Sequence, residues 1–263
     1  MSGVLAVLRK ELTVYFATPI FYLMGFFFLL VEGFLFFFIY FNYFQTASFQ
    51  VAQNPQFASM LDPFQVVFRS FFEDLGFIFL LITPILTMRL LAEEKRAGTA
   101  ELLFTYPLPD WAVILGKFLA AFVVFVTLLI LTVVYPLIFA FLTRMDWGQV
   151  ASGYVGVFLL GGACLALGLF ASSLTANQII AAISAFALLL LFWLLGALKE
   201  MGSAWGGFLG TLSSFLGTVS LREHLPNMAK GVVDTKDLIF YLCFTFFFLF
   251  LTKRQLESRR WRA

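Results

Sequence analysis

The sequence has few charged residues. Only 12% of its 263 residues are Asp, Glu, Lys or Arg, about half of the share that a water-soluble domain uses to cover its surface. By contrast, 62% of the residues are hydrophobic, and the mean hydropathy is +0.96. This composition excludes a soluble domain and a disordered chain. It predicts an all-α protein that is embedded in a membrane.

Cysteine and histidine are also scarce, with two residues of the first and one of the second. Cys164 and Cys243 lie in apolar runs, so they provide neither a disulfide framework nor a zinc site. His224 has no companions for a metal or nucleophilic site, and we interpret it as a loop residue. The sequence therefore predicts no catalytic residue, no metal site and no cofactor site.

A nucleotide-binding loop is missing as well. Such a loop needs a glycine, four further residues and then Gly-Lys-Ser or Gly-Lys-Thr, because backbone amides must surround the phosphates. The pair Gly116-Lys117 is followed by Phe118, and Trp111 stands where the first glycine should be. Any ATP and its Mg²⁺ must therefore bind to another protein.

Long apolar runs are abundant. A membrane-spanning helix needs roughly 20 apolar residues, and six runs reach or approach this length. We predict spans at residues 20–43, 72–91, 113–141, 154–174, 179–198 and 238–253 of a single transmembrane domain, 1–263. Pro84 predicts a kink in the second span. The last run is short, so we expect Lys253 and Arg254 to extend their side chains to the membrane surface and help it to cross. Residues 45–69 are predicted to form an outer loop.

The first residues predict a helix at the membrane surface. Apolar residues recur at helical spacing from Val4 to Phe16, with Arg9, Lys10 and Thr13 between them, as in a helix that lies among lipid headgroups. Six crossings place both termini on one side, and most of the 17 Lys and Arg residues fall on that side. Both termini would therefore face the cytoplasm.

The segment between the second and third spans, residues 92–110, has the most specific pattern. The acids and bases of residues 93–96 lie within one helical turn and predict a solvated extension of the second span. Gly98 would end it, and Thr99 can cap another short helix with Glu101 in its first turn. An alternative interpretation is a connecting loop with no further role, in which the charged residues only keep the segment in water.

The string Glu-Glu-Lys-Arg-Ala-Gly-Thr-Ala-Glu-Leu-Leu at residues 93–103, followed by Pro-Leu and by Gly116-Lys117, resembles ABC transporter permeases of the type-two export class. Within this class, the string resembles most the sequences of the gliding-motility permease family. The string Leu-Arg-Lys-Glu-Leu at residues 8–12 also resembles that family. The resemblance implies that residues 93–103 contain a cytoplasmic coupling helix that docks on a separate ATPase. The implied ATPase-coupling residues are Glu93, Glu94, Arg96, Gly98, Thr99, Glu101 and Leu102.

The resemblance also implies partners. These are two copies of an ABC ATPase subunit, which would bind ATP and Mg²⁺, and a second permease chain that makes a homodimer or a heterodimer. An accessory subunit with an external domain is a further implied partner, and the location would be a bacterial cytoplasmic (inner) membrane. The 37 Phe residues have no basic groove beside them, so we expect contact with lipid and not with nucleic acid.

The external segment, residues 199–237, predicts amphipathic helices before the last span. Bulky residues follow the helical repeat from Trp205 to Val219, and Gly202, Gly206 and Gly210 lie on the opposite side. Such a helix either rests on the membrane or packs by its glycine face. The resemblance implies a lid over the translocation path.

Two features are predicted inside the membrane. Glu32 lies in the first span, where a carboxyl group is costly; it either lines a substrate path or is a neutral acid that hydrogen-bonds to a neighbouring helix. Cys164, Gly168 and Ser172 repeat every four residues and predict a packing surface for another helix, from this chain or from a second subunit.

The leading interpretation is the membrane subunit of an ATP-driven exporter that carries out no covalent chemistry itself. Its cargo is open, and mechanical work on an external partner is included. One alternative is an intramembrane lipid-modifying enzyme, which would need a cluster of His, Asp or Glu on neighbouring spans. Another is a membrane anchor protein without transport.

Overall fold

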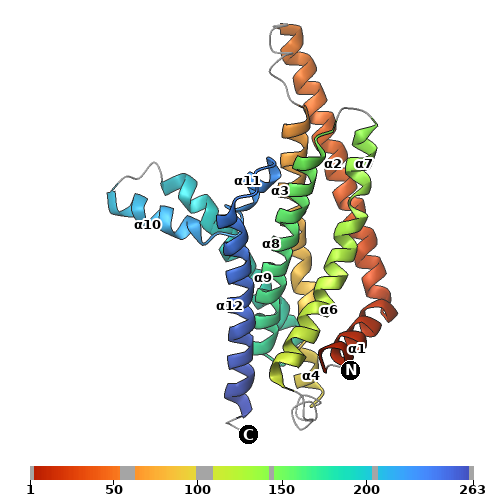
Figure 1. The fold of residues 1–263 in the computed structure, drawn as a ribbon, viewed down its shortest axis with the longest axis vertical. Coiled ribbons are helices and arrows are strands. Elements are labelled where there is room, and N and C mark those ends of the chain that lie inside the picture. The colour runs from red at the N-terminus through yellow and green to blue at the C-terminus, as the bar shows by residue number, and fades with distance from the viewer. Residues whose placement is uncertain (1–2, 54–62, 99–108, 142–144, 203–206, 261–263) are drawn as a thin grey trace.

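The computed structural model describes residues 3–53, 63–98, 109–141, 145–202 and 207–260, and within these ranges the regular structure is helical, as predicted. The helices are α1 (Gly3–Ala17), α2 (Pro19–Gln53), α3 (Pro63–Thr87), α4 (Ala92–Arg96), α6 (Asp110–Leu131), α7 (Val134–Ala140), α8 (Trp147–Leu174), α9 (Gln178–Gly202), α10 (Gly207–Thr218), α11 (Leu225–Ala229) and α12 (Thr235–Arg260). Figure 1 shows the long helices side by side in a bundle, with α1 oblique at one end.

Helix α8 forms the centre of the bundle. In its apolar segment 78% of the residues are buried, against 22% for α2, and it contacts α3, α6, α9, α11 and α12. Helix α2 packs against α3 and leaves large side chains such as Phe26, Phe34 and Phe37 exposed. In a bilayer these phenylalanines would face lipid, which explains how so apolar a surface is tolerated.

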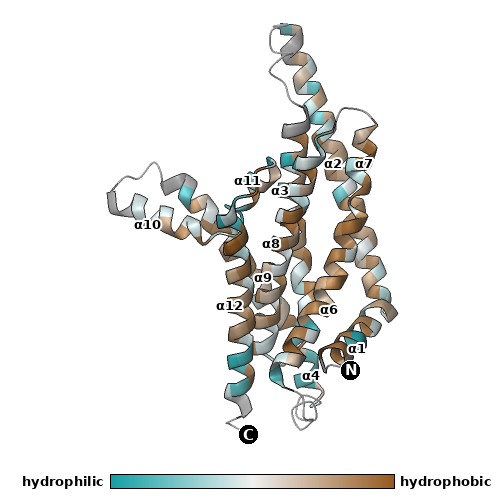
Figure 2. Cartoon of the chain, in the orientation of Figure 1, coloured by the Kyte–Doolittle hydropathy of each residue, from teal (hydrophilic) through white to brown (hydrophobic). Residues whose placement is uncertain are grey.

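Six helical stretches within the described residues are long and apolar enough to cross a membrane, as predicted. They are Pro19–Phe49, Val67–Arg96, Asp110–Ala140, Trp147–Leu174, Gln178–Lys199 and Thr235–Ser258. Figure 2 shows hydrophobic residues along the middle of the long helices and hydrophilic ones at α4 and at the C-terminal end of α12. The chain is therefore a multi-pass membrane protein.

Several boundaries differ from the prediction. Much of the expected outer loop, 45–69, is helical, because α2 continues to Gln53 and α3 begins at Pro63. The last helix is also longer than the predicted span. Its polar end stays helical where Lys253 and Glu257, one turn apart, form an ion pair at 2.9 Å, a spacing that stabilises helices. Hydropathy marks the membrane-crossing part of a helix and not its ends.

The third predicted span consists of two helices, α6 and α7, that meet at residues 132–133. Pro136 explains the interruption, because it has no N–H group to bond to the carbonyl of Thr132. That carbonyl instead accepts a hydrogen bond from the N–H of Tyr135 at 3.1 Å.

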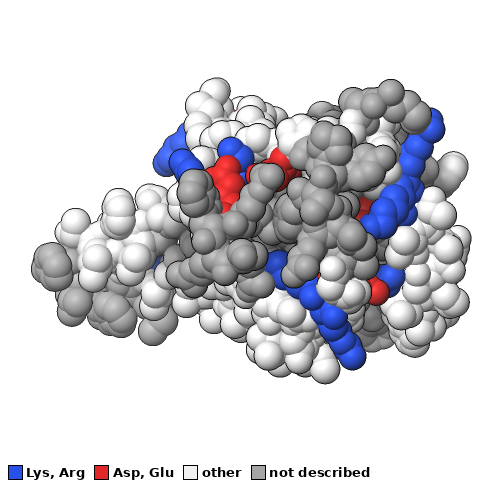
Figure 3. Space-filling model, turned by 90° about the horizontal axis from the view of Figure 1, so that it is seen from below, with Lys and Arg blue, Asp and Glu red and all other residues white. Residues whose placement is uncertain are grey.

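The C-terminal end of α9 and helix α10 form a hairpin that extends sideways from the bundle (Figures 1 and 3). The turn after α10 is fixed to α9, since Leu221 N–H donates to the Phe192 carbonyl at 3.2 Å and the Ser220 hydroxyl donates to the Trp193 carbonyl at 3.3 Å. The described part of α10 therefore lies beside the bundle. Of the predicted bulky and glycine faces, Trp205 and Gly206 lie outside the described residues.

His224 lies in the turn before α11, as predicted, but it makes specific contacts that the sequence did not indicate. The side chain is buried, with Nδ1 2.6 Å from Asp237 Oδ1 and Nε2 3.1 Å from the Thr218 carbonyl oxygen. Its ring stacks on Phe240 at 3.9 Å. His224 thus joins the end of α10 to the start of α12. The sequence did not indicate these contacts, because neither partner is its neighbour in the chain.

Helices α1 and α4 and the C-terminal end of α12 lie at the same end of the bundle (Figure 1). Figure 3 views this end and shows Lys and Arg side chains spread around it, with acidic side chains between them. This is the end that the sequence predicts to be cytoplasmic, and it contains the candidate site.

Candidate functional site

Helix α4 is a direct extension of a membrane span. Helix α3 ends at Thr87, residues 88–91 form turns, and α4 follows at Ala92–Arg96. Gly98 then has a φ of 69°, a left-handed conformation that favours glycine and ends helices. The structure thus has the expected extension and its break. The other implied coupling residues, Thr99, Glu101 and Leu102, lie outside the described residues.

Helix α8 holds the junction between α3 and α4 from the side. The N–H groups of Leu91 and Ala92 each donate to Ser172 Oγ at 3.1 Å. The Ser172 hydroxyl in turn donates to the Met88 carbonyl at 3.1 Å. One buried hydroxyl therefore satisfies three backbone groups that the helix break would otherwise leave unpaired.

The same face of α8 allows α3 to approach closely. A Cβ atom on Gly168 would lie 2.3 Å from Thr87 Oγ1, which no real contact permits, and Cys164 is fully buried. At Gly168 and Ser172, the predicted packing surface is therefore used by helices of this chain.

Replacing Ser172 with Ala should loosen the α3–α4 junction. Two buried N–H groups would lose their acceptor, which should destabilise the protein by about 2 kcal/mol. Hydrogen exchange of residues 88–92 in the detergent-solubilised protein should become faster. Ser173→Ala is the matched control, because the Ser173 hydroxyl donates only to the nearby Phe170 carbonyl; equal exchange in both variants would refute the role of Ser172.

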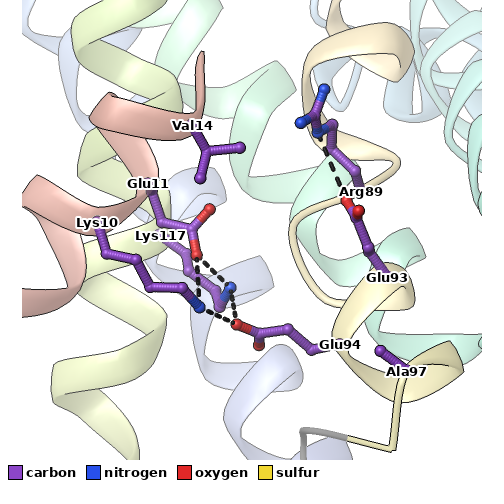
Figure 4. Close-up of a pocket in the computed structure, with 8 residues that line it drawn as sticks. All are labelled: Lys10, Glu11, Val14, Arg89, Glu93, Glu94, Ala97 and Lys117. Atoms are coloured by element: carbon purple, nitrogen blue, oxygen red, sulfur yellow. Dashed lines mark hydrogen bonds and ion pairs between the residues drawn. The ribbon is translucent and has the colours of Figure 1, made fainter. Parts of the chain in front are cut away.

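An ion network joins α1, α4 and α6 (Figure 4). Lys117 Nζ, on a side chain only 1% exposed, lies 2.8 Å from Glu11 Oε1 and 2.9 Å from Glu94 Oε1. Lys10 Nζ lies 2.9 Å from the same Glu94 oxygen and 3.7 Å from Glu11 Oε1. Two cations thus balance two anions, and a buried Lys is stable only with such compensation.

Close packing of α1 on α6 makes this network possible. A Cβ atom on Gly116 would lie 2.7 Å from Val7 Cβ, so glycine is required there. Val7, Glu11 and Tyr15 are spaced four residues apart and form the buried face of α1. The Tyr15 hydroxyl donates to the Leu86 carbonyl at 2.5 Å, which also fixes α1 to α3. Burial raises the pKa of Tyr15, so its hydroxyl remains a donor.

Residues 70–252 match the family model described as ABC-2 family transporter protein. The chain belongs to this family. A comparison with curated proteins gives no match. The matched range includes α4, Lys117 and Ser172, whereas α1 and Glu11 precede it. This chain is accordingly the membrane-spanning permease of an ABC transporter, a type of subunit that works with an ABC ATPase.

In this ABC-2 permease the two acids of the predicted coupling segment face different ways. The Glu93 side chain is 53% exposed and lies 3.5 Å from Arg89 Nε, whereas Glu94 is 13% exposed and turns inward to Lys117. Arg96 and Gly98 are exposed. Glu93, Arg96 and Gly98 are therefore accessible to a partner, while Glu94 fixes α4 to α1 and α6.

Sequence reasoning did not identify Glu11 and Lys117 as site residues. They are 106 positions apart in the chain, so no local pattern pairs them. A signal existed in the sequence, because Lys117 stands at the start of a long apolar run and Glu11 has the helical spacing of apolar residues in α1. The exposed member, Lys10, is partly desolvated, but Glu94 and Glu11 together raise its pKa.

A depression of about 240 Å³ opens beside the network, and Figure 4 shows its lining. Its lining residues are Lys10, Glu11, Val14, Arg89, Glu93, Glu94, Ala97 and Lys117. Because its lining carries both basic and acidic side chains, the depression is suited to contact with a polar protein surface or with water. Among the described residues, no group of three or more His, Cys, Asp or Glu side chains is placed to hold a metal ion.

Glu32 of the permease lies inside the bundle on α2. It is fully buried, and neither carboxylate oxygen has a hydrogen-bond partner among the described residues. The hydrogen bond to a neighbouring helix, one of the two roles considered from the sequence, is thus absent there. A role in the substrate path stays a prediction.

Proposed function

We propose that this permease couples ATP hydrolysis by a separate ABC ATPase to export, or to mechanical work, across a bacterial cytoplasmic (inner) membrane. Two ATPase subunits would bind ATP and Mg²⁺, and this chain would bind neither. A second permease chain, identical or related, would complete the transporter, and an accessory subunit with an external domain would join it. The likeness to gliding-motility permeases supports the accessory subunit.

The main support for this proposal is that α4 is anchored on two sides. Hydrogen bonds to Ser172 connect it to α8, and the Glu94–Lys117 ion pair connects it to α6. A short helix held in this way moves together with its neighbours when it is pushed, whereas a flexible connector would absorb the movement. Force applied to the exposed side of α4 would therefore reach α3, which α4 extends, as well as α6 and α8.

The proposed orientation places α1, α4 and the C-terminal end of α12 in the cytoplasm. Lys and Arg side chains gather at this end of the bundle, and cytoplasmic ends of membrane proteins are enriched in them. Cytoplasmic ATP would then be available to an ATPase docked on α4.

Charge reversal at Glu93 tests this function. The tagged chain is purified from membranes of its host, and the co-purified protein that bears a phosphate-binding loop is quantified by mass spectrometry. Glu93→Lys should reduce the co-purified ATPase at least about tenfold, because like charges across an interface cost more than about 1.4 kcal/mol.

Glu257→Lys is the matched control. Glu257 lies near the C-terminal end of α12, at the same end of the bundle, and its side chain is 27% exposed, so its reversal should change ATPase recovery less than about twofold. Recovery that is equally high with both variants would contradict docking on α4. A wild-type chain that retains no ATPase would favour the membrane-anchor alternative.

A further inference from the structure

The buried face of α2 contains one acidic residue among aromatic ones. Phe21, Phe28 and Phe36 are buried on this face, and Glu32 lies between the last two at helical spacing. The Phe28 ring packs on Phe79 of α3 at a centroid distance of 4.9 Å. The carboxyl group of Glu32 thus occupies an aromatic seam between membrane spans.

Nearby hydroxyl groups give their hydrogens to other acceptors. The Tyr135 hydroxyl donates to the Leu29 carbonyl at 2.6 Å. The Thr132 hydroxyl donates to the Leu129 carbonyl at 2.7 Å, so in its 3.2 Å contact with the Tyr154 hydroxyl it must accept. None of these hydroxyls is therefore available as a donor to Glu32.

The helix interruption between α6 and α7 places a side chain against the residue next to Glu32. Tyr135 follows the break, and a Cβ atom on Gly33, the residue after Glu32, would lie 3.1 Å from the Tyr135 hydroxyl oxygen. Among the described residues, the titratable groups that interact electrostatically with Glu32 are Asp74 on α3, Tyr135 on α7 and Tyr154 on α8. Because none of these three is a cation, an ionised Glu32 would have no counter-charge among them.

A buried carboxylate without a counter-charge or a donor is far less stable than the neutral acid. We propose that Glu32 is an intramembrane proton-binding site, which holds a proton in the arrangement described here and releases it when α2 separates from α3 and α7. Among the described residues no hydrogen-bond partner reaches the carboxyl group, so a proton is the cation that fits. This site does not depend on the proposed coupling to an ATPase.

Infrared spectroscopy of the full chain in lipid nanodiscs tests the bound proton. The difference spectrum between the wild type and Glu32→Gln at neutral pH should show the loss of one carboxylic-acid carbonyl band at the high frequency of an acid without hydrogen bonds. Glutamine matches a protonated Glu in shape, so the variant should fold. The band should persist in Asp74→Asn. Loss of a carboxylate band from the Glu32→Gln spectrum, in place of the acid band, would overturn the proposal.

Proton release is tested by a distance between α2 and α7. Spin labels are attached through Phe38→Cys and Leu137→Cys, both at exposed positions, in a chain that also carries Cys243→Ser. Raising the pH should lengthen the distance between the labels by several ångströms when Glu32 is present, and not in the Glu32→Gln background. An unchanged distance with Glu32 present would refute the link between proton release and helix separation.

Discussion

Replacing Lys117 with Met should destabilise the permease by about 3 kcal/mol, the lower end of the cost of removing one partner from a buried ion pair. Glu11 and Glu94 would keep their charges but lose the cation that lies within 2.9 Å of both. The cost stays at the lower end because Lys10 remains near both carboxylates. Denaturant titration of the detergent-solubilised chain measures the change in the free energy of unfolding.

Loss of Lys117 should also disconnect α4 from α6. In the reconstituted transporter we expect ATP hydrolysis to continue while transport falls, because the helix that receives the force is no longer fixed to a span. Lys10→Met is the matched control. Lys10 contacts the same two carboxylates, but its side chain is 57% exposed, so its removal should cost less than about 1 kcal/mol.

A double variant separates charge from packing at this site. Glu11→Gln combined with Lys117→Met removes one anion together with the cation, and it should recover part of the stability lost in Lys117→Met alone. If Lys10→Met were as destabilising as Lys117→Met, burial of the network would not be the source of its strength.

Replacing Gly161 with Ala should cost about 3 kcal/mol by overpacking the bundle centre. The new Cβ atom would lie 2.0 Å from Phe125 Cζ. Phe125 cannot easily move aside, because it is buried and packs on Phe79 at a centroid distance of 4.4 Å. The expected result is a lower unfolding midpoint and a reduced yield of folded protein in detergent.

The adjacent residue provides the control. A Cβ atom on Gly162 would meet Phe122 at 3.4 Å, an ordinary contact. Gly162→Ala should therefore be neutral or stabilise α8 by up to about 1 kcal/mol through helix propensity. Similar losses in the two variants would mean that α8 needs glycine for a reason other than the close approach of α6.

The membrane spans were predictable because their signal is local. Each span is a continuous run of apolar residues, and a helix satisfies its backbone hydrogen bonds within its own segment. The break at Gly98 was equally readable, since glycine favours the left-handed conformation found there. Pro136 is a sequence signal for the break between α6 and α7. It was not used, because the long apolar run around it indicated one continuous span.

The candidate site was only partly predictable. The charge pattern of residues 93–96 indicated a helical extension, but it could not show that Glu93 faces outward while Glu94 pairs with Lys117. Which face of a short helix is buried depends on what packs against it. The partner of His224 was hidden in the same way, because Asp237 lies on the following helix.

By itself the sequence determined that the chain has six apolar helical runs long enough to cross a membrane, that residues 1–263 contain no phosphate-binding-loop motif, and that residues 93–98 form a charged extension ending at a glycine. These properties depend on neighbouring residues alone. Only the tertiary structure decided that Glu11, Glu94 and Lys117 meet, that Ser172 holds the α3–α4 junction, and that Glu32 is buried with no hydrogen-bond partner among the described residues. Helix packing brings distant residues together, and whether a charge in the membrane is neutralised depends on which helices become neighbours.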